Sequence, residues 1–147
     1  MKLLILSDSH HTDLESLNFE KYDAVLHCGD YGNSYSVLMK NHVFFVKGNC
    51  DLHGEEALLL ELYGKSIFIT HGHRENVKYG LDRLIYKSLE KNASITLFGH
   101  THEQCCFMEE GILFINPGSF PRSYVIITDE DIQLFKDGKV KSIQYRW

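Results

Sequence analysis

The segment ASITLFGHTHEQ, residues 93–104, sets the question that the rest of this sequence must answer. A short, largely apolar run over residues 93–97 is typical of a strand buried on both faces of a sheet. Directly after it, Gly99 precedes two histidines, His100 and His102, that stand one residue apart. Isolated histidines at strand ends are usually incidental, so the pair indicates chemistry only if other strands end in the same way.

Five segments are predicted to be short buried strands, and the first three are separated by the dozen or more residues that a parallel crossover needs. They are Leu3–Leu6, Ala24–Leu26, Val43–Val46, Ile67–Ile69 and Ile95–Phe98. Residues 57–70 are typical of a hairpin that turns at Gly64. Helices are expected weakly after Asp13, over Ser34–Met39, and more strongly over Asn76–Lys91, where apolar residues recur at helical spacing.

Beyond Cys105 the pattern alternates between apolar and polar residues, which predicts consecutive antiparallel strands. Their turns are expected at Glu110-Gly111, Asp129-Glu130 and Asp137-Gly138. The fold class is therefore α/β, with a front half of buried strands that is completed or faced by antiparallel strands.

The composition favours one domain over residues 1–147 of a cytoplasmic protein. The net charge of −5 without a basic stripe argues against a long nucleic acid as partner. No apolar run approaches the roughly 20 residues that span a bilayer, so no membrane is expected either. The four cysteines lack CxxC spacing, which favours reduced thiols over a disulfide framework.

Each of the five predicted strands is followed at once by potential metal ligands. In chain order these residues are Asp8, His10, Asp30, Asn49, His71, His100 and His102. Side chains that follow the carboxyl ends of strands in an α/β sheet converge on one crevice. Any one of these clusters alone is explained by ordinary turn chemistry. Their recurrence after every strand predicts a shared site.

Oxygen and imidazole donors without thiolates suit Mn²⁺, Ni²⁺, Fe²⁺, Co²⁺ or Zn²⁺ in a site with open positions. Seven donors are too many for one tetrahedral ion and are enough for two ions that share a carboxylate. A structural zinc site would need closely spaced thiolates, which the cysteines do not provide.

In order, Asp8-x-His10, Gly29-Asp30, Gly48-Asn49-Cys50-Asp51, His71-Gly72-His73 and Gly99-His100-Thr101-His102 resemble the five sequence blocks of the calcineurin-like metallophosphoesterases. The similarity is greatest to their small, single-domain phosphodiesterase branch. It implies a four-layer αββα sandwich in which two mixed β-sheets pack face to face with helices outside.

The resemblance also implies a dinuclear centre, with Mn²⁺ the favoured cation, and a bridging hydroxide as the nucleophile. One ion would be held by Asp8, His10, Asp30 and His102, and the other by Asp30, Asn49, His71 and His100. Asp30 would bridge the two ions and, with Asn49 and His73, would be catalytic. Substrate contacts are expected from Asn49, His73 and Arg74, although His73 serves equally well as a hydrogen-bonding partner behind the ligands.

The chain departs from the broad family pattern at Cys50, where many members carry a histidine that protonates the leaving oxygen. A thiol is a poorer match for that task, so we expect good leaving groups or another acid, with His73 the first candidate and His53 the second. Asp51 is expected to cap its loop or orient a ligand histidine.

The leading hypothesis is a metal-dependent phosphodiesterase acting on a small phosphoester. Phosphomonoester or nucleotide hydrolysis at the same site is a rival that the ligands cannot separate. A non-catalytic binding scaffold is a rival of another class, since the fold also serves as a docking scaffold in the retromer coat. That scaffold lacks several metal-site histidines, whereas all seven positions are filled here. Assembly into a homo-oligomer also stays open.

Overall fold

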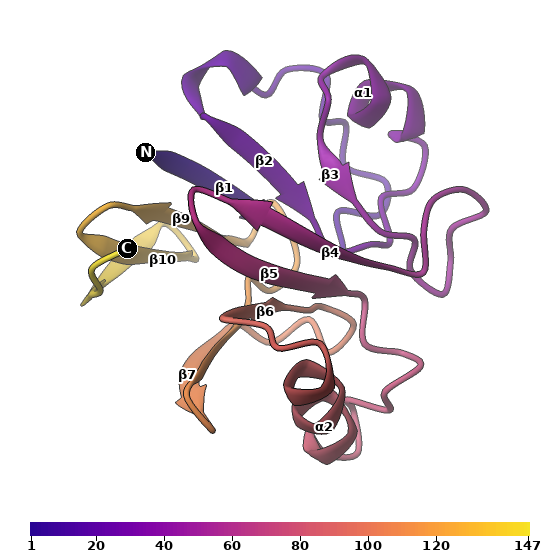
Figure 1. The fold of residues 1–147 in the computed structure, drawn as a ribbon. Helices are drawn as coiled ribbons and strands as arrows, with labels where there is room; N and C mark the ends of the chain where they lie inside the picture. Colours follow the sequence, from indigo (N-terminus) through magenta and orange to yellow (C-terminus); the bar gives the residue numbers. More distant parts are fainter.

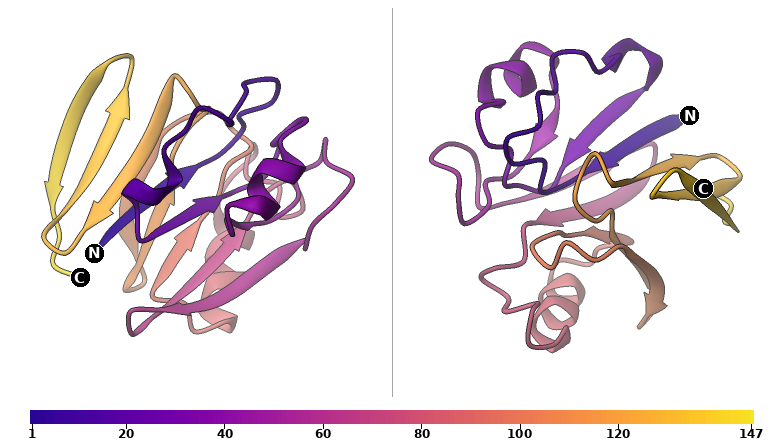
Figure 2. Two further views of the ribbon diagram at one scale, coloured as in Figure 1. Left: turned by 90° about the horizontal axis from the view of Figure 1, so that it is seen from above. Right: turned by 180° about the vertical axis from the view of Figure 1, so that it is seen from behind.

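Two β-sheets form the centre of the fold in the computed structural model, which describes residues 1–147. The first sheet has the order β11-β10-β9-β1-β2-β3 and the second has the order β4-β5-β6-β8-β7. Both sheets are mixed, because parallel pairs such as β1 with β2 and β5 with β6 adjoin antiparallel ones such as β1 with β9 and β4 with β5. The two sheets lie face to face, with α1 and α2 on opposite outer sides (Figures 1 and 2).

The strands of the first sheet are β1 (Lys2–Leu6), β2 (Ala24–His27), β3 (Phe44–Phe45), β9 (Ser123–Thr128), β10 (Asp131–Lys136) and β11 (Lys139–Gln144). Those of the second are β4 (Ala57–Leu62), β5 (Lys65–Thr70), β6 (Ile95–Leu97), β7 (Cys105–Glu109) and β8 (Ile112–Asn116). The helices are η1 (Phe19–Lys21), α1 (Tyr35–Lys40) and α2 (Asp82–Glu90).

Three apolar clusters account for the layers. The largest lies between the sheets and joins residues of both, among them Leu3 and Leu26 from the first and Ile67 and Ile95 from the second. A second cluster lies between the first sheet and α1, which contributes Leu38. The third lies between the second sheet and α2. Strands covered on both faces must be apolar throughout, and the predicted αββα sandwich is confirmed.

The expected hairpin over residues 57–70 is confirmed as β4 and β5, and its turn is made by Tyr63 and Gly64. Both turn residues have positive φ, of 48° and 82°, the conformation that a two-residue hairpin turn requires. The three turns expected after Cys105 also lie between strands. However, β8 and β9 do not pair with each other, because β8 runs parallel to β6 in the second sheet and β9 runs antiparallel to β1 in the first.

Two of the expected helices are wrong in part. The helix predicted over Asn76–Lys91 begins only at Asp82, because Asn76 and Gly80 adopt positive φ of 52° and 146° that interrupt a helix. After Asp13, turns and the short η1 replace the weak helix. There the Asp13 carboxylate accepts the backbone N–H of Glu15 at 2.9 Å, a local bond that competes with helix formation. Neither α1 nor α2 is long and apolar enough to cross a bilayer.

Candidate metal centre

The seven predicted ligands all lie in loops that follow strands of the two sheets. Asp8 and His10 follow β1, Asp30 follows β2, Asn49 follows β3, His71 follows β5, and His100 and His102 follow β6. Because β1, β2 and β3 run parallel to one another and β5 runs parallel to β6, the loops of each sheet emerge at one edge. These two edges meet, because His71 lies 3.3 Å from Asp30 and His102 lies 3.2 Å from Asp8.

Five of these side chains come from residues whose backbone is in the left-handed region. The φ angles are 50° for Asp8, 43° for His10, 60° for Asp30, 70° for His100 and 63° for His102. Residues with a side chain rarely adopt this region, and each costs on the order of 1 kcal/mol or more. Strain of this kind persists only where the surrounding structure imposes it and clusters at functional sites. In the loops after β1, β2 and β6 it turns these side chains toward the site.

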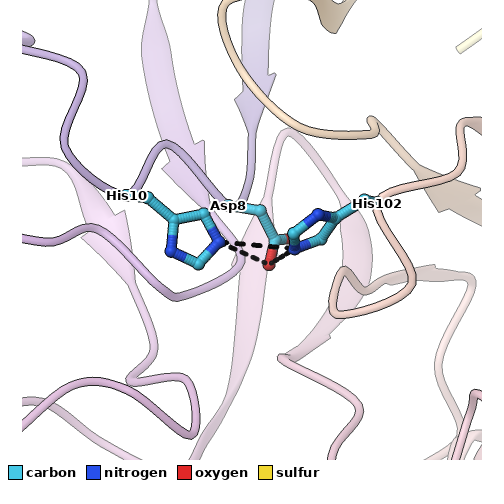
Figure 3. A group of neighbouring side chains, drawn as sticks. All are labelled: Asp8, His10 and His102. Carbon is cyan, nitrogen blue, oxygen red and sulfur yellow. Dashed lines mark hydrogen bonds and ion pairs between the residues drawn. The ribbon is translucent and has the colours of Figure 1, made fainter.

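Two groups of side chains could hold a cation, since the ligand atoms of each lie within 4.8 Å of one another. The inner group is Asp8, Asp30 and His71, all of them buried. The outer group is Asp8, His10 and His102, which Figure 3 shows converging on one carboxylate oxygen. Asp8 is common to both groups, so the two candidate positions are adjacent.

The inner group is fixed by hydrogen bonds from behind. His71 donates from Nδ1 to the carbonyl oxygen of Cys28 at 2.7 Å, which leaves Nε2 facing the site. That nitrogen lies 3.3 Å from Asp30 Oδ2 and 3.1 Å from Asn49 Oδ1. The other carboxylate oxygen of Asp30 accepts the backbone N–H of Cys50 at 3.0 Å. Each donor is therefore held in one orientation.

Within the inner group, the pKa of His71 is raised and the pKa of Asp30 is lowered. Burial by itself lowers the pKa of His71, but the hydrogen bond to Asp30 and the charges of Asp8 and Asp30 raise it overall. Burial would raise the pKa of Asp30, yet its hydrogen bond and charge interaction with His71 hold it far below its usual range. The hydrogen bond between them thus favours the protonated form of His71 and the ionised form of Asp30.

The outer group is more open to solvent. The His10 and His102 side chains are 36% and 49% exposed, whereas Asp8 is fully buried. Their Nε2 atoms face each other at 3.3 Å. They lie 3.9 Å and 3.2 Å from Asp8 Oδ1. Two imidazole nitrogens that point at each other and at one carboxylate oxygen form an arrangement that a shared cation satisfies.

Asp8 gives the most direct sign that the site is shaped for a cation. Its Oδ2 accepts hydrogen bonds from Ser7 Oγ at 2.6 Å and from the backbone N–H of His100 at 3.0 Å. Its Oδ1 is buried and has no hydrogen-bond partner, although His71 Nε2 also lies within 3.8 Å of it. An unpaired buried carboxylate oxygen is costly. Carboxylate and imidazole donors are those that divalent transition cations take, so the residues fit the expected metal.

Asn49 and His100 lie at the inner side of the centre. Asn49 contacts His71 as described, and the His100 ring centroid is 5.1 Å from that of His71. Burial, and then the charge of His71, lower the pKa of His100, so its imidazole is kept neutral, as a metal ligand must be.

Two glycines allow the loops to approach this closely. A Cβ atom at Gly48 would lie 2.1 Å from Asp30 Oδ1, and one at Gly99 would lie 2.6 Å from Asp8 Oδ2. Neither distance is tolerable for a side chain, so these positions accept only glycine.

Asp51 caps the loops, one of the two roles that the sequence predicts for it. Its carboxylate accepts three backbone N–H bonds, from Asp30 at 2.7 Å, Gly48 at 2.7 Å and Tyr31 at 3.1 Å. It thereby ties the loop after β2 to the loop after β3. The backbone that presents Asp30 is held by a carboxylate that itself takes no part in the two groups.

His27 is a supporting residue that the sequence pattern does not reveal, because it lies inside a strand. Its Nδ1 accepts the backbone N–H of Gly29 at 3.0 Å, so Nε2 carries the proton and donates to Ser9 Oγ at 2.9 Å. Burial, and then the charge of His71, lower its pKa to about 3. The neutral ring joins the loop after β1 to the loop after β2.

The remaining predicted residues lie around the centre. The His73 ring is 5.5 Å from that of His71 and 6.1 Å from that of His100. Its Nδ1 is buried without a partner. Arg74 is exposed, and its guanidinium lies 3.6 Å from the Glu56 carboxylate. His53 is exposed on the loop after β3, so its ring is not part of either group.

The comparisons with known proteins agree with this geometry. Residues 1–129 match the family described as the calcineurin-like phosphoesterase superfamily domain. A probable metallophosphoesterase of Bacillus subtilis, YsnB, is 37% identical over 150 residues, which cover 89% of this chain and 86% of the relative. Phosphodiesterase MJ0936 of Methanocaldococcus jannaschii is 28% identical over 146 residues, covering 80% and 83%.

Among solved structures, a conserved protein of Streptococcus pneumoniae that is described as a predicted phosphoesterase superposes with a TM-score of 0.79. It is 29% identical, and the match covers 98% of this chain and 97% of that one.

Proposed function

Because the chain belongs to the calcineurin-like phosphoesterase superfamily, we propose that it hydrolyses phosphodiesters at a dinuclear metal centre. The ligands are the seven residues Asp8, His10, Asp30, Asn49, His71, His100 and His102. Mn²⁺ is the favoured cation, and Ni²⁺, Fe²⁺, Co²⁺ and Zn²⁺ suit the same donors.

The observation that carries the proposal is the buried Asp8 Oδ1, which lacks a hydrogen bond and lies within 3.9 Å of three imidazole nitrogens. Two divalent ions held by these residues would lower the pKa of a bound water and would clamp the phosphoryl oxygens of an in-line displacement. No serine or cysteine nucleophile is then required.

This chain's own residues orient the reacting groups. His71 is fixed by the Cys28 carbonyl, and Asp30 is fixed by the backbone N–H of Cys50. In the proposal, Asp30 bridges the ions, and Asn49 and His73 contact the phosphate. Arg74 would have to leave Glu56, 3.6 Å away, to reach a phosphate oxygen. Breaking this ion pair would cost at most about 1 kcal/mol of free energy, because Arg74 is exposed and surface ion pairs are weak.

The preference for diesters is supported by the phosphodiesterase of M. jannaschii, a relative of 28% identity. Monoester hydrolysis uses the same ligands, so only a substrate comparison separates the two. A non-catalytic scaffold has no need for seven filled ligand positions, five of them on strained backbone.

We also propose that residues 1–147 act as one domain in a reducing, cytoplasmic setting. The shared core between the sheets supports the first part, because neither sheet would keep a covered inner face alone. The four free thiols support the second.

The test is metal analysis of the purified protein together with hydrolysis of bis(p-nitrophenyl) phosphate and of p-nitrophenyl phosphate. We expect about two metal ions per chain, hydrolysis that a chelator abolishes and Mn²⁺ restores, and a higher kcat/KM for the diester. Protein that retains no transition metal, or that turns over neither ester when loaded, would refute the function. A higher kcat/KM for the monoester would reverse the substrate preference.

A further inference from the structure

A cleft of about 380 Å³ opens beside the outer group of the metal centre. The residues that matter for its chemistry are His10, Tyr31, Tyr35, Cys50, Leu52 and His53. They come from the loops after β1, β2 and β3, which also carry predicted metal ligands, and from the first residue of α1. None of the seven ligands apart from His10 lines it, so its walls are free to contact another part of a molecule bound at the centre.

The cleft is continuous with the centre. His10 belongs both to the outer group and to the cleft wall. Cys50 lines the cleft, and its backbone N–H donates to Asp30 Oδ1 at 3.0 Å. Tyr31 follows Asp30 directly in the sequence. A phosphate held by the ligands would therefore have its ester substituent within reach of the cleft.

Aromatic rings make up one side of the cleft. The His53 ring lies 4.9 Å from the Tyr35 ring at an interplanar angle of 38°, and Tyr35 lies 6.3 Å from Tyr31. Phe45 contacts the Tyr35 ring edge-on at 5.9 Å from behind. The Tyr31 hydroxyl also donates a hydrogen bond to the His53 backbone carbonyl, so the loop after β3 is tied to the loop after β2. The Tyr31 ring and the backbone of His53 are therefore held in place before any ligand arrives.

The rim exposes apolar surface that nothing in the chain covers. Leu52 is 86% exposed and Tyr35 is 37% exposed. Covering apolar surface is favourable by roughly 25 cal/mol per Å². The one carboxylate of the lining, Asp51, already accepts three backbone N–H bonds. The amide of Asn33 and the imidazole of His11 are exposed polar groups of the lining. A flat ring with polar edges fits this combination of surfaces.

We propose that this cleft binds the flat aromatic group of a phosphate ester, with a nucleobase as the ring that its mixed lining fits. The proposal rests on the function above, because it assumes that the phosphate lies at the metal centre. It makes the aromatic wall and Leu52 determinants of substrate choice. Stacking of one base on an aromatic side chain strengthens binding by about tenfold or more.

The experiment measures affinity, so that it does not depend on turnover. Isothermal titration calorimetry on manganese-loaded protein compares adenosine 5′-monophosphate with ribose 5-phosphate, which differ only by the base. A second pair, phenyl phosphate and methyl phosphate, separates a simple aryl group from a nucleobase. Free phosphate is assayed after each titration so that hydrolysis is not read as binding. We expect the nucleotide to bind at least about tenfold more tightly than the sugar phosphate.

Variants assign the effect to the cleft. His53→Ala and Leu52→Ala change exposed loop residues and should bring the affinity of the nucleotide close to that of ribose 5-phosphate. The affinity of ribose 5-phosphate itself should not change. Tyr86→Leu is the control, because Tyr86 is 78% exposed on α2, on the opposite outer side of the fold. It should keep the wild-type ratio.

The outcomes separate this inference from the function. Tighter binding of the aromatic member in both pairs, or of the nucleotide alone, supports the proposal. Tighter binding of phenyl phosphate alone would replace the nucleobase with a simple aryl group as the ligand of the cleft. Equal affinities within both pairs would overturn it, even if the protein hydrolyses phosphodiesters. A parallel loss for both members of a pair in His53→Ala would also count against it. If the nucleotide binds more tightly than ribose 5-phosphate but the protein hydrolyses no phosphoester, the proposal for the cleft stands and the proposed enzymatic function is rejected.

Discussion

The inner and outer groups of the metal centre use the same kinds of donor but are built in different ways. In the inner group every side chain is buried, and His71 and Asp30 are oriented by backbone groups of Cys28 and Cys50. In the outer group the two imidazoles are 36% and 49% exposed. Neither is hydrogen-bonded to anything but the other.

This difference indicates that the fold organises the inner group, whereas the outer group would be organised only by a bound cation. A buried group must have its charges and hydrogen bonds satisfied for the chain to fold. An exposed pair of imidazoles carries no such requirement. The inner group should therefore contribute to stability as well as to chemistry, whereas the outer group should contribute to chemistry alone.

The largest effect is expected from Asp30→Asn, which tests whether the two groups act as one centre. If Asp30 bridges the ions, loss of its charge weakens both positions. We expect kcat/KM for bis(p-nitrophenyl) phosphate to fall by about a thousandfold or more, since metal ions stabilise the transition state by several kcal/mol. The retained metal, measured on the same preparation, should fall as well.

The matched control for that variant is Asp82→Asn, which removes a carboxylate of the same type from the exposed first turn of α2. It should leave turnover and metal content unchanged. Substantial turnover by Asp30→Asn would reject Asp30 as the bridging carboxylate and would leave Asp8 as the one residue common to the inner and outer positions.

The second prediction compares His71→Ala with His10→Ala in chelator-treated protein at pH 7. His71→Ala removes the imidazole that lies 3.3 Å from Asp30 and 3.8 Å from Asp8. Because two buried carboxylates then lose a partner, the free energy of unfolding should fall by about 3 kcal/mol. His10→Ala removes an exposed side chain and should cost less than about 1 kcal/mol. Chemical denaturation measures both values. Both variants should retain less metal than the wild type. If the two variants lose the same free energy of unfolding, the proposed difference between the inner and outer groups is wrong.

The third prediction concerns His27, which supports the loops of the centre from inside the first sheet. The folded protein holds it neutral with a pKa of about 3, whereas the unfolded chain takes up the proton below about pH 6.5. Protons therefore favour the unfolded state, and stability should fall by up to about 1.4 kcal/mol per pH unit as the pH drops from 6.5 toward 3.

The pKa shifts of His71 and Asp30 change the stability outside the range from pH 6.5 to 5. The raised pKa of His71 gives stability that is fully present below about pH 6.5 and is lost only as the pH rises. The lowered pKa of Asp30 gives stability that is lost only below about pH 4. Denaturation of metal-free protein at pH 6.5 and 5 should thus show a shallower pH dependence in His27→Gln than in the wild type. Identical slopes would exclude His27 as the source.

The smallest effect is expected from Cys50→His. The inner group uses the backbone N–H of Cys50 and not its thiol, and the side chain is exposed. Metal content should therefore stay at the wild-type level. Burial and the neighbouring Asp30 carboxylate raise the pKa of the thiol, so an imidazole is the better acid near pH 7. Alkyl esters with poor leaving groups should be hydrolysed several-fold faster, about tenfold at most, and an unchanged rate would argue against an acid at this position.

Much of the fold is predictable from local sequence. The five buried strands are recognisable because strands covered on both faces are continuously apolar. The hairpin at Gly64 is recognisable from its turn chemistry. The helix predicted from Asn76 fails in its first half because apolar residues at helical spacing, such as Val77, also occur in a compact loop. Val77 is buried against Gly72 without helical backbone.

The candidate site is likewise predictable only where its residues follow a local sequence pattern. Asp8, His10, Asp30, Asn49, His71, His100 and His102 are recognisable because each stands just after a buried strand, where ligands converge in sheets of this kind. His27 is not recognisable as a support, because it lies inside a strand and its partners belong to the loops after β1 and β2. The capping role of Asp51 is predictable, but its partners Asp30 and Tyr31, which belong to another loop, are not. A sequence pattern contains no information on such contacts.

The sequence by itself therefore determined the kind of chemistry, since donor types and their positions after strands are local properties of the chain. The tertiary structure alone decided how the donors are divided into a buried and an exposed group. It also decided that Asp8 is common to both groups and that an aromatic cleft adjoins them. These features depend on distances between loops of two different sheets, and such distances exist only after the shared apolar core has brought the sheets together.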